Sequence, residues 1–207
     1  MSGSGKTSLA RALVGLWPPL GGDIRLDGSE LAHYSPIALG RHIGYLPQNV
    51  GLIDGTVAEN ISRFRPDATS ETVLNAARLA GVHEIIATLP QGYDTRVGTR
   101  GSALSAGQRQ RIGLARALYG DPFLVVLDEP NSNLDFVGDT ALTAALSAAK
   151  ARGAIVIVVA HRPSAIAVCD RLVYLVNGRM AAYGAKAEVL KQVTAPAARI
   201  EGVRVDG

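Results

Sequence analysis

The sequence predicts an α/β fold in which a mainly parallel sheet carries flanking helices and an inserted α-helical subdomain. Residues 123–127 and 155–159 are continuous apolar runs, which are typical of strands buried on both faces of a parallel sheet. Helical patterns dominate about residues 56–118, between an early strand and the first of these runs. The helical stretch is therefore expected between two parts of one α/β core.

Each expected element has a local signal. Residues 5–15 are helical until the Pro and Gly residues of 17–22 end the helix. Short strands follow at 24–26 and 43–46, and Ser70 is the expected N-cap of a later helix. Further helices are expected at 57–61, 71–80, 83–89, 105–119, 136–150 and 185–193, and a hairpin at 172–176 and 180–183 with a turn at Asn177-Gly178.

Length and composition suit a globular domain of 207 residues. The hydrophobic content is 47%, the charged content is 19%, and the net charge of +3 is too small to indicate a nucleic-acid partner. The single cysteine, Cys169, excludes an internal disulfide and suits a reducing compartment. Because no apolar run approaches the ~20 residues of a membrane span, we expect a chain of cytosolic character.

The segment Gly3-Ser4-Gly5-Lys6-Thr7 has the pattern G-x-G-K-[ST] of a phosphate-binding loop. Its small residues let backbone N–H groups surround a phosphate, and the following helix adds the positive end of its dipole. Lys6 supplies a point charge for phosphate oxygens, and the Thr7 hydroxyl can bind Mg²⁺. The full motif begins with a further Gly and a strand, so we expect residues before Met1 in a longer protein.

Two carboxylates, Asp128 and Glu129, follow the apolar run 123–127 and are expected at the carboxyl edge of the sheet. The first can hold Mg²⁺ and the second can polarise an attacking water. A single Asp after a strand is more often a helix cap, but the phosphate-binding loop favours a metal site. Gln48 and His161 also end predicted strands. Each alone is more often structural, yet at this edge they can contact Mg²⁺, water or a γ-phosphate.

The segment Leu104 to Gln108 opens the helix predicted at 105–119. Ser105 is the expected N-cap, and the small residues Ala106 and Gly107 leave N–H groups open to an anion. An ordinary helix cap explains the same residues, and the two uses are compatible. We expect the arginines of this helix to form a solvated face rather than a nucleic-acid patch, namely Arg109, Arg111 and Arg116.

The order of these motifs resembles the nucleotide-binding domain of ABC transporters over nearly the whole chain. Gly3 to Thr7 resembles the Walker A motif, Gln48 the Q-loop and Leu104 to Gln108 the LSGGQ signature. Leu124 to Asp128 resembles Walker B with Glu129 as the catalytic carboxylate, Ser132 to Asp135 resembles the D-loop, and His161 resembles the switch histidine. Each motif alone is weakly specific, whereas six in this order are very specific.

The resemblance implies a P-loop NTPase fold that binds and hydrolyses ATP with Mg²⁺. It implies catalytic roles for Glu129, His161 and Gln48, and metal contacts from Thr7, Gln48 and Asp128. It also implies a head-to-tail homodimer, in which the signature helix of one subunit covers the ATP of the other. The nucleotide-binding residues implied by the match are Ser2, Gly3, Ser4, Gly5, Lys6, Thr7, Ser8, Gln48, Ser105, Gly107, Gln108, Asp128 and Asp135.

Finer matches resemble the exporter branch. Residues 54–61 and 89–95 are similar to exporters whose membrane and ATPase domains share one polypeptide. Residues 129–135 and 161–164 resemble type I protein secretion ATPases of Gram-negative bacteria. This implies a transmembrane domain, a membrane-fusion protein and an outer-membrane channel as partners, at the cytoplasmic face of the inner membrane. We expect an ATP-binding domain over 1–194, incomplete at its N-terminus, and a C-terminal tail over 195–207.

Two residues depart from the family pattern. Ala106 replaces a Gly of the signature, which is tolerable at an ordinary backbone angle and costly at a positive φ. Thr99 replaces the Glu that exporters usually carry before the signature, which predicts weaker coupling to the membrane domains.

Three functions stay open at this point. The first is the ATPase domain of a type I secretion exporter. The second is a remnant with weak nucleotide affinity and little ATPase activity, because a missing strand would leave main-chain groups of its neighbours unpaired. The third is a stand-alone ATPase subunit of another ABC transporter, which the exporter-like segments disfavour. An ABC ATPase acting on nucleic acid is disfavoured further, because no long coiled-coil insertion separates the motifs.

Overall fold

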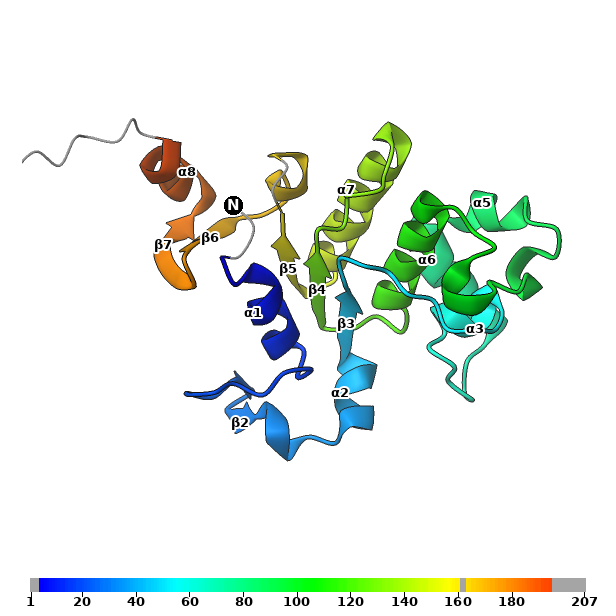
Figure 1. Ribbon diagram of the computed structural model, residues 1–207, viewed down its shortest axis with the longest axis horizontal. Helices are drawn as coiled ribbons and strands as arrows, with labels where there is room; N and C mark the ends of the chain where they lie inside the picture. The colour runs from blue at the N-terminus through cyan, green and yellow to red at the C-terminus, as the bar shows by residue number, and fades with distance from the viewer. Residues whose placement is uncertain (1–3, 161–162, 195–207) are drawn as a thin grey trace, which may run out of the picture. The chain divides into compact units, whose positions relative to one another are not determined.

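The computed structural model describes residues 4–160 and 163–194, which divide into two compact units (Figure 1). The larger unit contains the described residues between 7 and 168, and the smaller unit contains residues 4–6 and 169–194.

The larger unit is built on a three-stranded parallel sheet of order β3-β4-β5. Strand β4 (Leu124–Asp128) lies in the middle and pairs with β3 (Ile43–Leu46) and with β5 (Ile155–Val159). The residues of β4 are all buried, as the apolar run predicts. The sequence therefore correctly identifies this strand, together with β3.

Alternate side chains of β4 enter two separate cores. Leu124 and Val126 pack with residues of α1 (Lys6–Leu13) and α2 (Pro36–His42). Val125 and Leu127 pack in the larger core, with residues of α6 (Ala106–Leu118) and α7 (Phe136–Ala151). This alternation follows from the two-residue period of a strand, and it places helices on both faces of the sheet.

Strand β5 differs from the prediction. The sequence predicts a second fully buried strand, but Ile155 is 55% exposed and the other β5 residues are half-buried. The two strands that flank β4 differ in how helices cover them, because β3 packs against α2 and α6 and is mostly buried, whereas β5 packs against α7. Apolar composition alone does not distinguish an edge strand from a central one.

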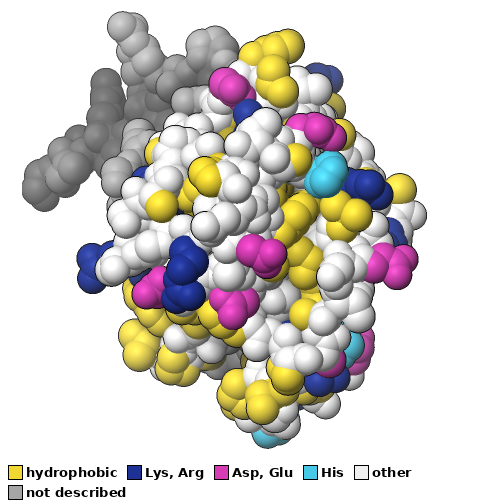
Figure 2. All heavy atoms as spheres, turned by 90° about the vertical axis from the view of Figure 1, so that its right-hand side faces the viewer, with side chains coloured by type: hydrophobic (Ala, Val, Ile, Leu, Met, Phe, Trp, Pro, Cys, Tyr) yellow, Lys and Arg dark blue, Asp and Glu magenta, His cyan; other side chains and the backbone are white. Residues whose placement is uncertain are grey.

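Helices α3 (Val57–Ile61), α4 (Ser70–Leu79) and α5 (His83–Ala87) confirm the helical character of residues 56–118. Helices α3 and α4 pack against α6, and α5 packs against α4 and a 3-10 turn at Gly92–Asp94. A second 3-10 turn at Thr99–Gly101 completes this region. Figure 2 shows acidic, basic and apolar side chains interspersed over its outer face.

The predicted N-cap of α4 is wrong by one residue. Thr69, and not Ser70, is the cap, because the Thr69 hydroxyl accepts from the Thr72 N–H at 3.2 Å. The Thr72 hydroxyl accepts in return from the Thr69 N–H, so a capping box closes the first turn.

Between α1 and β3 the chain forms elements that the sequence predicts only in part. Strands β1 (Arg25–Leu26) and β2 (Ser29–Glu30) form a hairpin around Asp27 and Gly28, and a 3-10 turn follows at Leu31–His33. Helix α2 was not predicted. Its signals were a Ser N-cap at Ser35, whose hydroxyl accepts from Ala38 N–H at 3.1 Å, followed by Pro at the first helical position.

The smaller unit confirms the terminal hairpin and helix. Strands β6 (Arg171–Val176) and β7 (Arg179–Ala185) pair antiparallel, and helix α8 (Lys186–Thr194) buries Val189. The turn residues Asn177 and Gly178 both have positive φ, at 48° and 76°, as the Asn-Gly pair predicts. A 3-10 turn at Pro163–Ile166 ends the larger unit.

Candidate functional site

Two acidic residues occupy the carboxyl end of the central strand. Asp128 is the last residue of β4 and is completely buried. Glu129 follows with a φ of +50°, and its N–H donates to the Val159 carbonyl of β5 at 2.8 Å. Since the carboxyl ends of parallel strands meet at one edge of a sheet, this is where a ligand site is expected in an α/β fold.

Gln48 lies at this edge as the sequence predicts. It comes two residues after β3, and its Nε2 donates to Oε2 of Glu129 at 3.1 Å. The bond joins residues 81 positions apart in the sequence. It leaves the amide oxygen of Gln48 as the acceptor atom for another partner.

The N-terminus of α6 has the predicted cap. Ser105 Oγ accepts from Gln108 N–H at 3.2 Å, and Gln108 Oε1 accepts from Ser105 N–H at 2.8 Å. This capping box fixes the first turn, and both Ser105 and Ala106 are exposed. Ala106 is helical without a positive φ, so the methyl group in place of Gly adds no backbone strain.

Gly107 lies against the loop after Glu129. A Cβ added to Gly107 would meet the Asn133 carbonyl oxygen at 3.3 Å, which is a tight contact. A larger residue at this position would therefore displace the D-loop segment from α6.

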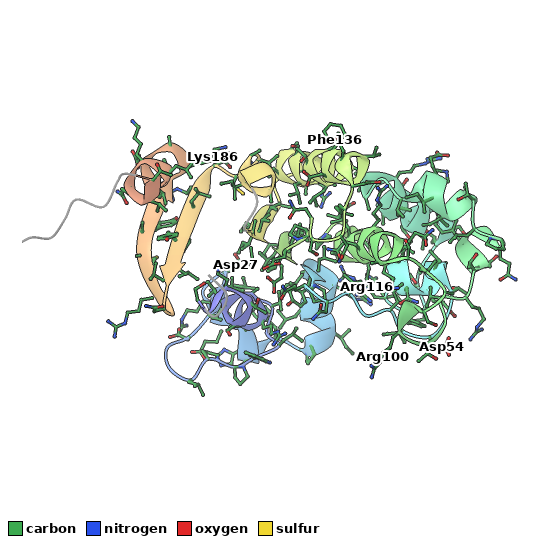
Figure 3. The ribbon with its side chains drawn as sticks, turned by 45° about the horizontal axis from the view of Figure 1, so that its top comes forward. Asp27, Asp54, Arg100, Arg116, Phe136 and Lys186 are labelled. Atoms are coloured by element: carbon green, nitrogen blue, oxygen red, sulfur yellow. The ribbon has the colours of Figure 1, made fainter. Side chains whose placement is uncertain are left out.

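The predicted solvated arginine face of α6 is wrong. Arg111 is buried and donates to Asp135 Oδ1 at 2.5 Å. Arg109 donates to the carbonyls of the preceding loop, and Arg116 Nη1 donates to Gly51 O at 3.0 Å. Burial lowers the pKa of Arg116. Figure 3 shows Arg116 within the packed part of the unit, whereas Asp54 and Arg100 lie at its margin.

Asp135 caps helix α7. Its Oδ1 accepts from Gly138 N–H at 2.7 Å as well as from Arg111. The Gly138 N–H is the main reason why the pKa of Asp135 lies below its usual range, and Arg111 lowers it further. The carboxylate that the family match assigns to nucleotide binding thus has a structural role within its own chain.

The Arg63 side chain forms hydrogen bonds at the ends of three elements. The sequence did not predict this role of Arg63. Its five N–H groups donate to five main-chain carbonyls, at the end of α2, the start of β3 and the end of α6. Burial lowers the pKa of this guanidinium to about 10. Periodicity does not reveal such a residue, because its partners are main-chain atoms far away in the sequence.

The structure describes the predicted phosphate-binding loop from Ser4 onward. Its residues Ser4, Gly5 and Lys6 belong to the smaller unit. Gly5 has a φ of +85°, a conformation that favours glycine, and Lys6 Nζ donates to Ser4 Oγ at 2.6 Å. Thr7, half-buried, and Ser8, exposed, continue α1 in the larger unit. Ser2, Gly3 and His161 lie outside the described residues.

The oxygen atoms at the carboxyl edge of the larger unit's sheet fit a magnesium ion that binds with a nucleotide. Within the described residues, no three His, Cys, Asp or Glu side chains gather as a metal-binding group. Magnesium that binds with a nucleotide uses one or two protein oxygens, and phosphates and waters supply the rest. In the larger unit, Asp128 can provide a carboxylate, Gln48 an amide oxygen and Thr7 a hydroxyl. In the smaller unit, taken by itself, the glycine conformation at Gly5 suits the close approach of a phosphate to the main chain.

A family model described as ABC transporter matches residues 1–132, about two thirds of the chain. The chain belongs to the ABC transporter family. Its fold is that of an ABC ATPase domain, a P-loop NTPase fold, as the motif order predicts.

This ABC ATPase domain is similar to ATP-binding proteins and subunits of several kinds. The type I secretion system ATP-binding protein PrsD of Rhizobium meliloti is 58% identical over 94% of the chain and 34% of that protein. The mitochondrial potassium channel ATP-binding subunit of Mus musculus is 40% identical over 92% of the chain and 27% of that protein. A bacterial Atm1-family ABC exporter solved with ATP bound matches with a TM-score of 0.85 and 36% identity, over 94% of the chain and 34% of that structure.

The chain therefore spans about a third of the length of the relatives it matches. Among the helices described, none has the length and apolar character needed to cross a membrane.

Proposed function

We propose that this ABC ATPase domain hydrolyses ATP to drive a type I protein secretion exporter. The observation that carries the secretion assignment is the 58% identity to PrsD along 94% of the chain, against 40% for the mitochondrial potassium channel subunit and 36% for the Atm1-family exporter. The contact of Gln48 with Glu129 beside buried Asp128 supports the hydrolytic chemistry.

In this proposal the carboxyl edge of the sheet performs the chemistry. Bound Mg²⁺ would neutralise developing charge on the phosphates. Asp128 would hold the ion, together with Thr7 and the oxygen of Gln48, and Lys6 would bind phosphate oxygens. Glu129 would accept a hydrogen bond from the attacking water and polarise it, with Gln48 orienting the carboxylate. His161 would contact the γ-phosphate.

A second copy of the chain would complete each ATP site. Ser105 is exposed at the N-terminus of a 13-residue helix, where free N–H groups and the helix dipole favour an anion. We infer that Ser105, Gly107 and Gln108 bind the nucleotide of the partner subunit, and that Asp135 lies at the same interface. Closure of the dimer would exclude water and assemble the site.

The whole transporter would include a transmembrane domain, and this ATPase domain would work at the cytoplasmic face of the bacterial inner membrane. A membrane-fusion protein and an outer-membrane channel would complete the export path. The transported substrate would be a protein.

The experiment has two arms. The purified chain is assayed for phosphate release from MgATP, with Glu129→Gln as the matched variant that keeps shape and removes the carboxylate. Turnover that Glu129→Gln abolishes supports hydrolysis at this site. Absence of turnover in the unsubstituted chain supports the remnant alternative instead.

The second arm tests secretion. The gene is deleted in its bacterial host, and secreted proteins are compared before and after complementation with the unsubstituted and Glu129→Gln genes. Loss of specific extracellular proteins, restored only by the unsubstituted gene, supports type I secretion. An unchanged set of secreted proteins favours an exporter of another branch, to which the 36% identity with the Atm1-family structure also points.

A further inference from the structure

Gln110 is a buried residue of α6 to which none of the motifs assigns a role. Its side chain is 1% exposed, and its Nε2 donates to the main-chain oxygen of Pro130 at 2.8 Å. Pro130 is itself buried and directly follows Glu129. Gln110 therefore contacts the segment that carries the proposed catalytic carboxylate.

The main chain of Glu129 has an unfavourable conformation. Its φ of +50° is in the left-handed region, which costs a residue with a side chain roughly 1–2 kcal/mol. Such a conformation persists when the surrounding bonds over-determine it. Backbone angles at Glu129 set the direction of its side chain, so the bonds that hold these angles also aim the carboxylate.

Main-chain and side-chain hydrogen bonds hold the turn at Glu129. The Glu129 N–H donates to Val159 O at 2.8 Å, and the Glu129 carbonyl accepts from Ser132 N–H at 3.2 Å. Gln110 donates to the Pro130 carbonyl, and the Asn131 side chain donates outward to Asp139 Oδ1 at 3.3 Å. The first two bonds join main-chain atoms, whereas a substitution of Gln110 removes the bond to the residue that directly follows Glu129.

We propose that Gln110 is a positioning residue for Glu129, whose amide group fixes the turn of residues 129–132 and so directs the carboxylate toward Gln48 and the attacking water. The inference rests on the proposed ATP hydrolysis. Without the Gln110 donor, the buried Pro130 carbonyl loses its partner, and the turn relaxes away from the positive φ. The Glu129 carboxylate is then no longer directed toward Gln48 and the attacking water.

The test uses Gln110→Met, which keeps the side-chain length and removes the donor. Gln110→Asn keeps the amide group but is one methylene too short to reach Pro130, and it serves if the Met variant does not fold. The control is Ile86→Val, a core change that lowers stability from α5, an element other than α6 and the segment 129–132. Turnover of MgATP and amide-resolved hydrogen exchange by NMR are measured for each chain.

We expect Gln110→Met to lower kcat by about ten- to a hundredfold with the KM for MgATP unchanged, because the carboxylate is misplaced while nucleotide contacts remain. Exchange at the Glu129 and Ser132 amides should rise by about tenfold, the effect of losing one hydrogen bond, with α6 amides unchanged. Ile86→Val should show neither local effect.

Each contrary result is decisive. Unchanged exchange at these two amides in both Gln110 variants overturns the inference, and so does an unchanged kcat. If the unsubstituted chain has no turnover, the proposed function fails, and the exchange measurement alone decides whether Gln110 fixes the turn.

Discussion

The Arg63 guanidinium offers the sharpest test of how this domain is held together. It donates to Arg116, Ala117 and Tyr119 carbonyls at the end of α6, and to Gly40 and Ile43 carbonyls at the end of α2 and the start of β3. A guanidinium has five N–H donors, and here all five have acceptors. Carbonyls in the last turn of a helix lack intrahelical partners, so Arg63 also caps α6.

The magnitude follows from these contacts. Five hydrogen bonds at a net of about 1 kcal/mol each would stabilise the fold by about 5 kcal/mol. Burial of the charge offsets part of this, because the fall of the Arg63 pKa from its ordinary value to about 10 corresponds to about 3 kcal/mol. Replacement by Met removes the net stabilisation that is left after this cost. It also leaves carbonyls of buried residues without a donor. We therefore expect Arg63→Met to lower the free energy of unfolding by about 3 kcal/mol.

The assay is urea denaturation followed by circular dichroism. Arg65→Met is the matched control, because Arg65 lies two positions away and pairs with surface Asp67, so its loss should cost less than about 1 kcal/mol. Arg63→Lys should fall between the two, since an ammonium keeps the charge but has three donors in a compact group. A cost for Arg63→Met no larger than that for Arg65→Met would refute the reasoning.

Three further predictions concern single residues. Thr69→Ala should cost about 1 kcal/mol in urea denaturation and Ser70→Ala only a few tenths, because the hydroxyl of Thr69 caps α4; equal costs would contradict the assigned cap. Gly44→Ala should prevent folding or cost several kcal/mol, judged by circular dichroism, because the added Cβ would lie 1.9 Å from a main-chain oxygen of α6; a stable variant would show that α6 can move. In an NMR titration of Arg111→Met, the Asp135 pKa should rise yet stay below its usual range, because the main-chain N–H in α7 remains; a full return to the usual value would assign the shift to Arg111 alone.

The sequence predicts this fold best where one local signal decides the outcome. The apolar run before Asp128 predicts a central buried strand, and Asn177-Gly178 predicts a hairpin turn, because composition and turn chemistry act within a few residues. Adjacent Thr69 and Ser70 both suit a helix cap. The choice between them depends on Thr72, whose hydroxyl completes the capping box.

Elsewhere, the burial of side chains depends on packing between distant segments, and the sequence alone does not predict it. The run 155–159 has the composition of a strand as buried as the central one, yet Ile155 is more than half exposed, because cover by neighbouring helices and not composition decides burial. The arginines of α6 are charged, so the sequence predicts a solvent-exposed face. Their side chains are long enough to reach main-chain carbonyls and the Asp135 carboxylate in neighbouring segments. Hydrophobic periodicity counts such residues as surface, because it does not record which buried acceptors lie within reach.

Some residues of the candidate site could be predicted from the sequence, and others could not. Motif order predicts that Gln48 and Glu129 share an edge of the sheet, and the 3.1 Å contact confirms it. Gln110 belongs to no chemical motif, since an amide buried in a helix has the same composition as one exposed to solvent.

Helix α6 links the residues proposed to bind the partner's nucleotide with the proposed catalytic edge. Its first turn presents Ser105 and Gly107, and its next turn holds Pro130 through Gln110 and Asp135 through Arg111. Both bonds end on the segment that follows β4. A helix of 13 residues resists a shift at one end alone, because its i to i−4 bonds keep the turns in register. A displacement of the whole helix that starts at its exposed N-terminal turn would therefore strain these two bonds or move residues 129–135.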